Sequence, residues 1–316
     1  SSFMAQPYVS WKHKFSDDVI ITAGLTSLYL AIFDANSTQD PVVNFSPIEP
    51  RFGMRWNVND KSALSFGMGY HSQTQPLYTR YYIPEGNTSP VNQDLDLTYS
   101  KHFVLGYSHQ LNKNFGIKAE AYYQDLTGIP IEMDSSAFSL TNAGSGFARV
   151  FPNALNNNGT GYNYGIELTV QRYFNKNWHA LFSGCLYNSQ YTPSDGIERN
   201  TSFNGIYAAN FLAGREFEVG KNKVLGLGVK VTGAGGKRKG IVDHVESAEQ
   251  GEGIFLDEGF NEDKFKDYFR FDIKTTYKIN KEKVTHEIGL DLVNLTGAQN
   301  IFCLLYTSDA ADDSYR

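Results

Sequence analysis

The sequence predicts an all-β protein, an antiparallel transmembrane β-barrel of which about 12 strands are present. Three observations predict it: apolar and polar side chains alternate along many segments, the segments are long, and short polar turns alternate with long connections. Successive side chains of a strand point to opposite faces, so each segment has one apolar and one polar face. Strands of about 10 residues or more, repeated in series, are typical of a barrel that is apolar towards lipid and polar towards a wet lumen.

The composition agrees with strands and excludes several other classes. Aromatic residues make up 14% of the 316 residues, and no segment approaches the length of a continuous apolar helix that crosses a bilayer. The net charge is −6 and there is no basic run, so a nucleic-acid partner is not expected. The two cysteines, Cys185 and Cys303, do not suggest a disulfide framework.

The clearest strand is 268–279, where Phe269, Phe271 and Ile273 lie on one side and Arg270 and Asp272 on the other. The same alternation predicts strands, in chain order, at 5–15, 19–35, 46–57, 62–82, 97–111, 115–131, 161–174, 178–191, 205–218, 224–234, 268–279 and 284–294. Within them, the apolar face includes Ile166, Leu168, Ile288 and Leu290, and the polar face includes Lys118, Glu120, Glu167 and Asp291.

Asparagine, aspartate and lysine mark the predicted hairpin tips, because Asn and Asp tolerate turn conformations. The tips are Ser16-Asp17-Asp18, Asn59-Asp60-Lys61, Asn112-Lys113-Asn114, Asn175-Lys176-Asn177, Lys221-Asn222-Lys223 and Asn280-Lys281-Glu282-Lys283. The other connections are long and lie at 36–45, 83–96, 132–160, 192–204 and 235–266. Short turns at one end and long loops at the other describe a barrel with periplasmic turns and external loops.

Aromatic residues gather near these turns and are expected to form one interfacial girdle of the barrel. They are Phe15, Trp56, Phe115, Tyr173, Phe174 and Trp178. The alternative is aromatic packing at the end of a soluble β-sandwich, which the length and number of the strands disfavour.

Several segments resemble the barrel of TonB-dependent receptors, in the branch that often carries an N-terminal carboxypeptidase-like regulatory domain. The segments are LTYSKHFVLGYSHQLNKNFGIKAEAYYQDLTGIPIE, NNNGTGYNYGIELTVQRYFNKNW, GIERNTSFNGIYAANFLAGREF, EPRFGMRWNVNDKSALSFGMGYHSQTQPLY and DYFRFDIKTTYKINKEKVTHEIGLDLVNLTGAQNIF. The resemblance extends over residues 5–302. It implies a 22-stranded barrel of the Gram-negative outer membrane, filled by an N-terminal plug on which TonB pulls.

The resemblance also implies the partners. They are outer-membrane lipid, the TonB complex acting through a plug that this chain lacks, and a scarce nutrient ligand such as a siderophore, vitamin, glycan or peptide. A surface lipoprotein is a further candidate. Only the C-terminal part of the barrel is matched, so 1–302 is expected to be a partial barrel domain. The end, CLLYTSDAADDSYR, resembles translated adapter sequence, and 303–316 is therefore expected to be non-native; a genuine disordered tail is the alternative.

Candidate ligand-binding residues come from loops and strand tops, because binding groups sit on loops held by a rigid scaffold. In the loop 132–160 they are Phe138, Arg149 and Phe151; elsewhere they are Arg199, Asn200, Asn204 and Arg238. The alternative for the latter group is a structural charge network across the lumen. The acidic loop 235–266 lacks the ligand spacing of a calcium loop.

No catalytic residue, metal site or cofactor is predicted. The seven histidines have no paired zinc-like spacing, and Gly236-Lys237-Arg238 does not complete a phosphate-binding loop. The expected function is therefore active transport without covalent chemistry. The alternatives are a binding, adhesion or porin-like barrel without active uptake, a barrel enzyme such as a protease or lipase, and a soluble β-sandwich.

Overall fold

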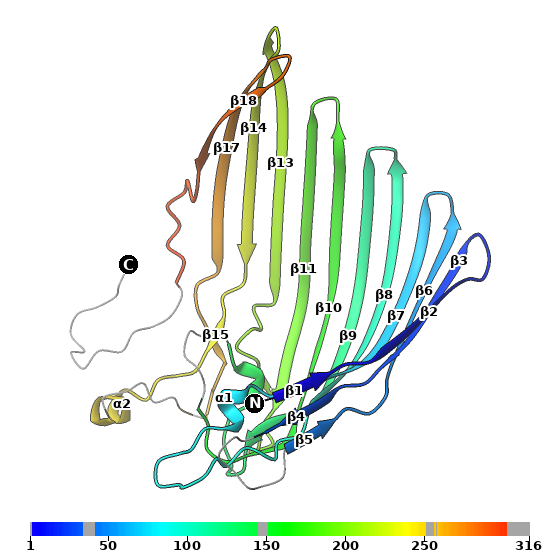
Figure 1. The fold of residues 1–316 in the computed structure, drawn as a ribbon. Helices are drawn as coiled ribbons and strands as arrows, with labels where there is room; N and C mark the ends of the chain where they lie inside the picture. Colours follow the sequence, from blue (N-terminus) through cyan, green and yellow to red (C-terminus); the bar gives the residue numbers. More distant parts are fainter. Residues whose placement is uncertain (1, 34–41, 145–150, 251–255, 257, 302–316) are drawn as a thin grey trace.

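The computed structural model describes residues 2–33, 42–144, 151–250, 256 and 258–301. Most of their strands form one large curved sheet (Figure 1). Twelve of its 13 strands follow one another in chain order, each antiparallel to the next, and β12 (Arg199–Asn200) pairs beside β11. The twelve are β2 (Tyr8–Lys14), β3 (Val19–Thr26), β6 (Glu49–Asn59), β7 (Ser62–Gln73), β8 (Thr98–Asn112), β9 (Phe115–Glu132), β10 (Leu155–Asn175), β11 (Trp178–Thr192), β13 (Tyr207–Gly220), β14 (Lys223–Ala234), β17 (Tyr268–Asn280) and β18 (Thr285–Leu292). The prediction of about 12 antiparallel strands is confirmed.

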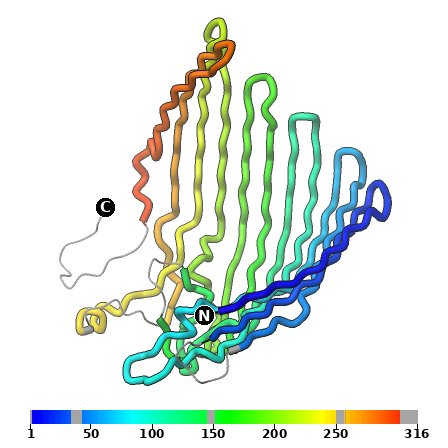
Figure 2. Tube along the Cα trace, in the orientation of Figure 1, coloured from blue at the N-terminus to red at the C-terminus, as the bar shows by residue number. Residues whose placement is uncertain are grey.

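All the predicted tips join neighbouring strands at one end of the sheet, and the long connections lie at the other (Figure 2). The backbone explains the residue types at two tips. Asn177 and Asn222 have φ values of 63° and 60°, in the left-handed region that Asn tolerates better than most residues. The polar turns therefore mark the tips because their residues can adopt the turn geometry.

Proline positions explain where the predicted strands break. Predicted strand 62–82 ends at Gln73, and after Pro76 the chain forms the short helix α1 (Leu77–Arg80). Proline donates no backbone hydrogen bond but fits the start of a helix. The prediction of a strand over 74–82 was wrong. It extended the strand too far because apolar residues continue past the proline.

The predicted strands 5–15 and 19–35 also divide near their long-loop ends, and residues 42–45, predicted as part of a loop, form a strand. β1 (Ser2–Ala5), β4 (Tyr29–Ile32) and β5 (Val42–Phe45) form a separate three-stranded sheet, in the order β1-β4-β5. Pro7 and Pro47 lie at the breaks and cannot donate to the ladder. The hydroxyl of Ser46 accepts the backbone N–H of Leu28 at 2.7 Å there, so the interrupted ladder stays satisfied.

Register confirms the predicted faces of the sheet. Ile166 pairs with Ala121 and Leu186, whereas Glu167 pairs with Glu120 and Cys185. Ile166 and Leu186 are each 57% exposed, so the apolar face is uncovered. The described residues form a single layer here (Figure 1), which excludes a β-sandwich for this sheet.

Of the aromatic residues expected to form a girdle, some lie on the apolar face and at least one does not. Phe115 and Trp178 pair with Arg172 and Arg215 on the apolar face, near the tips. Tyr173 instead projects over the polar face, where its hydroxyl is 3.7 Å from the position that a Cβ on Gly116 would occupy. Its ring therefore does not lie on the apolar face with Phe115 and Trp178.

Buried apolar side chains gather at the long-loop end, and they include Leu95, Leu97, Ile129, Ile131, Leu155 and Tyr191. The long connections there also contain the 3-10 turn Leu140–Asn142, the two-stranded ribbon of β15 (Arg238–Lys239) and β16 (Asp263–Lys264), and α2 (His244–Gln250). Neither α-helix in the described part is long and apolar enough to cross a membrane. The packed part of the fold is thus a cap of loops over one end of the sheet.

Candidate functional site

We call the described residues of connections 74–97, 133–154, 193–206 and 235–267 the loop cap. Arg238 joins two of these connections. Its Nε donates to the carbonyl of Asn204 at 3.1 Å, its Nη1 donates to the carbonyl of Glu262 at 2.9 Å, and its backbone N–H donates to the carbonyl of Ser202 at 3.0 Å. A guanidinium has several fixed donors, so one arginine can hold separate segments. Arg238 therefore acts as a clamp between loops.

Asparagine side chains continue this clamp. Asn204 is 1% exposed, and its amide group donates to the side-chain oxygens of Asn188 and Asn200 at 2.7 and 2.6 Å. The amide of Asn261 donates to the carbonyl of Asn200 at 3.0 Å across 61 residues of chain. Buried polar groups need such partners, so each amide contributes to the shape of the cap.

Arg199 is held by a carboxylate four residues earlier. Its Nη1 and Nη2 lie 2.8 and 2.6 Å from the two oxygens of Asp195, and Arg199 is 8% exposed. This bidentate pair lowers the pKa of the Asp195 carboxyl, mainly through the hydrogen bond from Arg199. This pair holds the guanidinium against its own loop.

The structure therefore brings together Asn200, Asn204 and Arg238, three of the residues selected from the sequence, and Arg199 directly precedes Asn200 in β12. Asn204 contacts both Asn200 and Arg238. Their bonds go to other parts of the cap, which fits the structural alternative. Ligand binding by these four residues stays a prediction.

The other candidates lie on the connection between β9 and β10. Phe138 is half-buried, and Arg149 lies outside the described residues. Phe151 is 51% exposed, and its ring centroid is 6.0 Å from that of Tyr78 and 5.2 Å from that of Tyr82. These three rings, called the aromatic cluster below, join two loops that are far apart in sequence.

Tyr78 and Tyr82 were missed from the sequence because they were placed on the strand 62–82. Pro76 and Pro84, which bracket them, were the available signal for a loop. Aromatic rings exposed on a loop offer flat surfaces for stacking, so the cluster is the best-placed ligand contact in the described part of the cap.

A buried arginine lies beside this cluster in the sequence. Arg80 is 0% exposed and donates from Nη1 to the carbonyl of Gln93 at 2.9 Å, while its Nε and Nη2 have no partner. Burial lowers the pKa of its guanidinium, and Tyr81, Asp96 and Asp94 oppose that shift. A buried donor without an acceptor is unfavourable, so this corner of the cap is not fully satisfied.

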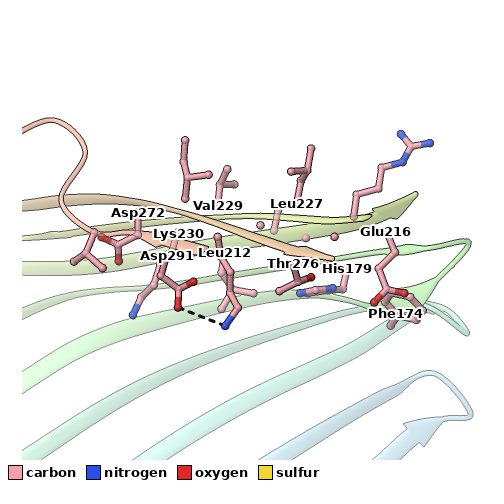
Figure 3. A pocket seen from close by; sticks show the side chains of 18 of the residues that line it. Phe174, His179, Leu212, Glu216, Leu227, Val229, Lys230, Asp272, Thr276 and Asp291 are labelled. Carbon is pink, nitrogen blue, oxygen red and sulfur yellow. Dashed lines mark ion pairs between the residues drawn. The ribbon is translucent and has the colours of Figure 1, made fainter. Parts of the chain in front are cut away.

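A second concave region lies on the polar face of β11, β13, β14, β17 and β18, with a cavity of about 590 Å³. Figure 3 shows Glu216, Thr276 and Asp291 on the side of the sheet opposite to Leu227 and Val229. Lys278 Nζ lies 3.1 Å from Glu216 and 4.0 Å from Glu287, and Lys274 Nζ lies 3.7 Å from Asp291. We call these residues the charge ladder.

Histidine contacts on the polar face were also missed. The rings of His71 and His102, on β7 and β8, have centroids 4.7 Å apart, and His102 Nε2 is 2.6 Å from the side-chain nitrogen of Gln124. The pairing register of β7 and β8 brings the two histidines together, although 31 positions separate them in the sequence. Within the described ranges, no three His, Cys, Asp or Glu side chains are placed to hold a metal ion.

A family model described as "TonB dependent receptor-like, beta-barrel" matches residues 3–301. The chain belongs to the TonB-dependent receptor family. The resemblance stated from the sequence is thereby confirmed. No curated protein sequence matches the chain significantly.

Solved structures share this fold at low sequence identity. The FrpB iron transporter of Neisseria meningitidis (F5-1 variant) is 15% identical with a TM-score of 0.63, covering 94% of this chain and 42% of that one. The ferric-catecholate import receptor Fiu of E. coli K12 is 12% identical with a TM-score of 0.64, covering 95% and 41%. The ferric preacinetobactin receptor BauA of Acinetobacter baumannii is 14% identical with a TM-score of 0.65, covering 93% and 39%. This chain thus spans well under half the length of each.

Proposed function

We propose that this chain forms part of the barrel of an outer-membrane receptor that binds a scarce nutrient outside the cell and imports it into the periplasm. The energy comes from TonB, acting through an N-terminal plug. The observation that carries the proposal is the family match over residues 3–301, on a meander with short turns at one end and a packed loop cap at the other. This arrangement suits capture at the cap and passage through the lumen.

The arrangement of the charged side chains favours passage of a ligand through the lumen rather than covalent chemistry. A barrel enzyme needs a nucleophile or activated water, a base and an orienting group held together. In the described ranges, the carboxylates of the charge ladder are paired with lysines, and Asp195 is paired with Arg199. A neighbouring cation makes a carboxylate a weaker base, which favours a structural role for these pairs. We therefore infer that this chain is not an enzyme.

The aromatic cluster is the proposed first contact for the ligand. Its rings suit a ligand with flat or ring-shaped groups, among them aromatic siderophores, vitamins and glycans. Two of the structural neighbours are a ferric-catecholate import receptor and a ferric preacinetobactin receptor, so ferric siderophores are the first compounds to test. A peptide ligand and a surface lipoprotein partner remain further candidates.

The test is uptake by cells that express the receptor at its full natural length. Radiolabelled ferric siderophores, vitamins, oligosaccharides and peptides are offered to cells with and without TonB. The expected result is accumulation of one class only when TonB is present. Accumulation that does not need TonB would instead support a porin-like barrel, and surface binding without accumulation would support an adhesion barrel. Hydrolysis of an offered compound would support the enzyme alternative.

Variants then test the cluster. Phe151→Ala is expected to weaken binding of the identified ligand, because it removes the ring that joins the two loops. Met133→Ala is the matched control, since Met133 is 65% exposed on the same connection and is not part of the cluster. Equal affinity of both variants would show that the cluster is not the contact.

A further inference from the structure

The apolar face of the sheet carries two arginines on either side of a tryptophan, close to a short turn. Trp178, the first residue of β11, pairs directly with Arg215 of β13. Arg172 of β10 pairs with Ala180, two residues beyond Trp178 on the same face. The alternation on these strands places all three with Ile166, Phe182 and Phe211. The turn beside them, Lys176–Asn177, is one of the short turns.

The contacts of Arg172 do not satisfy all of its hydrogen-bond donors. Its guanidinium carbon lies 3.8 Å from the centroid of the Trp178 ring, and its Nη2 donates to the carbonyl of Asn175 at 3.1 Å. Its Nε is buried and has no hydrogen-bond partner. Stacking on the indole orients the guanidinium but does not neutralise its charge.

Arg215 is a charge within an apolar stretch of its strand. Its guanidinium carbon lies 5.0 Å from the centroid of the Phe217 ring, and the face continues with Ala213 and Leu227. Glu216, the adjacent carboxylate, points to the opposite face, where it meets Lys278. Throughout the described part of the chain, neither Arg172 nor Arg215 forms an ion pair with a carboxylate.

A groove lies next to these cations. It has a volume of about 420 Å³ and is lined by Trp178, Ala213, Arg215, Leu227 and Val229, together with His179 and Gly214. The small side chain of Ala213 between larger neighbours leaves the space. Leu227 and Val229 project from the sheet on the side away from the charge ladder (Figure 3). The groove is therefore apolar along its length and cationic at Arg215.

Unpaired positive charge on a lipid-facing surface is unfavourable unless an anion meets it, and the penalty grows with depth. A phosphate group is a suitable anion, because guanidinium donors match phosphate oxygens in pairs. Neighbouring strands are about 4.8 Å apart. The backbones of Arg172 and Arg215 are two strands apart, so two long side chains can reach one headgroup beside Trp178.

We propose that Arg172, Trp178 and Arg215 bind the headgroup phosphate of an anionic glycerophospholipid, with one acyl chain in the groove over Ala213. The inference rests on the proposed function for its orientation, since the short turns then face the periplasm and the site lies in the phospholipid leaflet. Charge complementarity favours an anionic headgroup, and Trp178 suits the interfacial depth.

The test is native mass spectrometry of the full-length receptor after equilibration with matched vesicles. One set contains phosphatidylglycerol and the other phosphatidylcholine, with the same acyl chains. The receptor is expected to retain phosphatidylglycerol preferentially. Arg172→Gln with Arg215→Gln is expected to lower that preference at least about tenfold, because two charge-assisted contacts are lost. Lys101→Gln is the control, since Lys101 lies on the same face near the long-loop end and pairs with Asp125.

Three outcomes would overturn the proposal. They are equal retention of both lipids by the wild type, an unchanged preference in the double variant, and displacement of phosphatidylglycerol by lipid A at equal concentration. The last outcome would assign the site to the other leaflet.

The variant Arg172→Lys with Arg215→Lys keeps both charges and is expected to keep part of the preference for phosphatidylglycerol. This variant separates a loss of lipid binding from a folding defect. TonB-dependent uptake is measured on the same variants and is expected to be retained. Lipid selectivity without any uptake by the wild type would instead count against the proposed function alone.

Discussion

The sheet and the loop cap are held together by different interactions. In the sheet, backbone groups of neighbouring strands pair over long stretches, as from Leu155 to Arg172 between β10 and β9, and side chains such as Ile166 remain exposed. In the cap, the buried side chains of Asn92 and Asn204 and the half-buried side chain of Arg238 donate to the backbones and side chains of other segments. The sheet should therefore tolerate substitutions that respect its two faces, whereas the cap should depend on individual residues.

The largest effect is expected where a substitution violates a face of the sheet. Ile166→Arg places a charge on the apolar face, and near the membrane centre this should destabilise the receptor by about 2–4 kcal/mol. The measurement is urea unfolding of the full-length receptor from lipid vesicles. Glu167→Arg is the matched control on the polar face and should have a smaller effect. Equal destabilisation by both variants would contradict the assignment of faces.

In the cap, a single amide is expected to have nearly as large an effect. Asn92 is 1% exposed; its amide group donates to the carbonyls of Pro152 and Asn153 at 3.4 and 2.9 Å, and its oxygen accepts from the N–H of Leu155 at 2.8 Å. Asn92→Ala removes three hydrogen bonds and should destabilise the local structure by about 2–3 kcal/mol, at about 1 kcal/mol each.

Hydrogen exchange of the segment 151–155 measures this opening. Asn87→Ala is the control, because Asn87 is exposed on the same connection. If exchange were equally fast in both variants, Asn92 would not be holding the two loops together, and the contrast between sheet and cap would be lost.

This contrast also explains what the sequence could predict. Period-two alternation sets the faces, and Asn-rich tips set the hairpins, so the order of the strands followed from local patterns. The cap has no such period. Asn261 reaches the carbonyl of Asn200 across 61 residues, and Phe151 meets Tyr82 from another connection. These contacts form only because the strands, which differ in length, end at positions that bring the loops together. No local sequence pattern reports those positions.

Part of the candidate site could be predicted for the same reason, because its residues are close together in the sequence. Arg199, Asn200 and Asn204 were selected because polar residues cluster near one strand top. The structure does bring Asn200 and Asn204 together, whereas Arg199 pairs with Asp195. Their partners were not predictable, because the choice between a ligand and another loop is made by three-dimensional packing. Tyr78 was missed because proline ends the strand before it.

The ion pair of Asp195 and Arg199 should make the stability of the loop 193–206 depend on pH. The pKa of Asp195 is lowered by the hydrogen bond from Arg199, so the folded loop binds a proton less readily than the unfolded chain. The pair therefore contributes its full stability above the unfolded carboxyl pKa of about 3.9, and that contribution is lost as the pH falls through the lowered folded-state pKa. The contribution should be about 1.5 kcal/mol, as for a hydrogen bond to a charged group.

Exchange of the segment 193–206, followed from pH 7 down to pH 3 with correction for intrinsic rates, checks this expectation. The wild type should open more readily only at the acid end, and Asp195→Asn should be more open at neutral pH with a flatter profile. A wild-type profile that parallels the variant would show that the pair does not hold the loop.

The smallest effect is expected in the charge ladder, although its residues look as well paired as those of the cap. Lys278 and its partners Glu216 and Glu287 are each 31–49% exposed, so water screens the charges. Lys278→Met should cost at most about 1 kcal/mol of receptor stability, and the difference from wild type should shrink as salt is raised. Urea unfolding of the full-length receptor at low and high salt measures it. A larger, salt-independent loss would mean that the complete barrel excludes water from this part of the lumen, and the ladder would then resemble the cap rather than the open sheet.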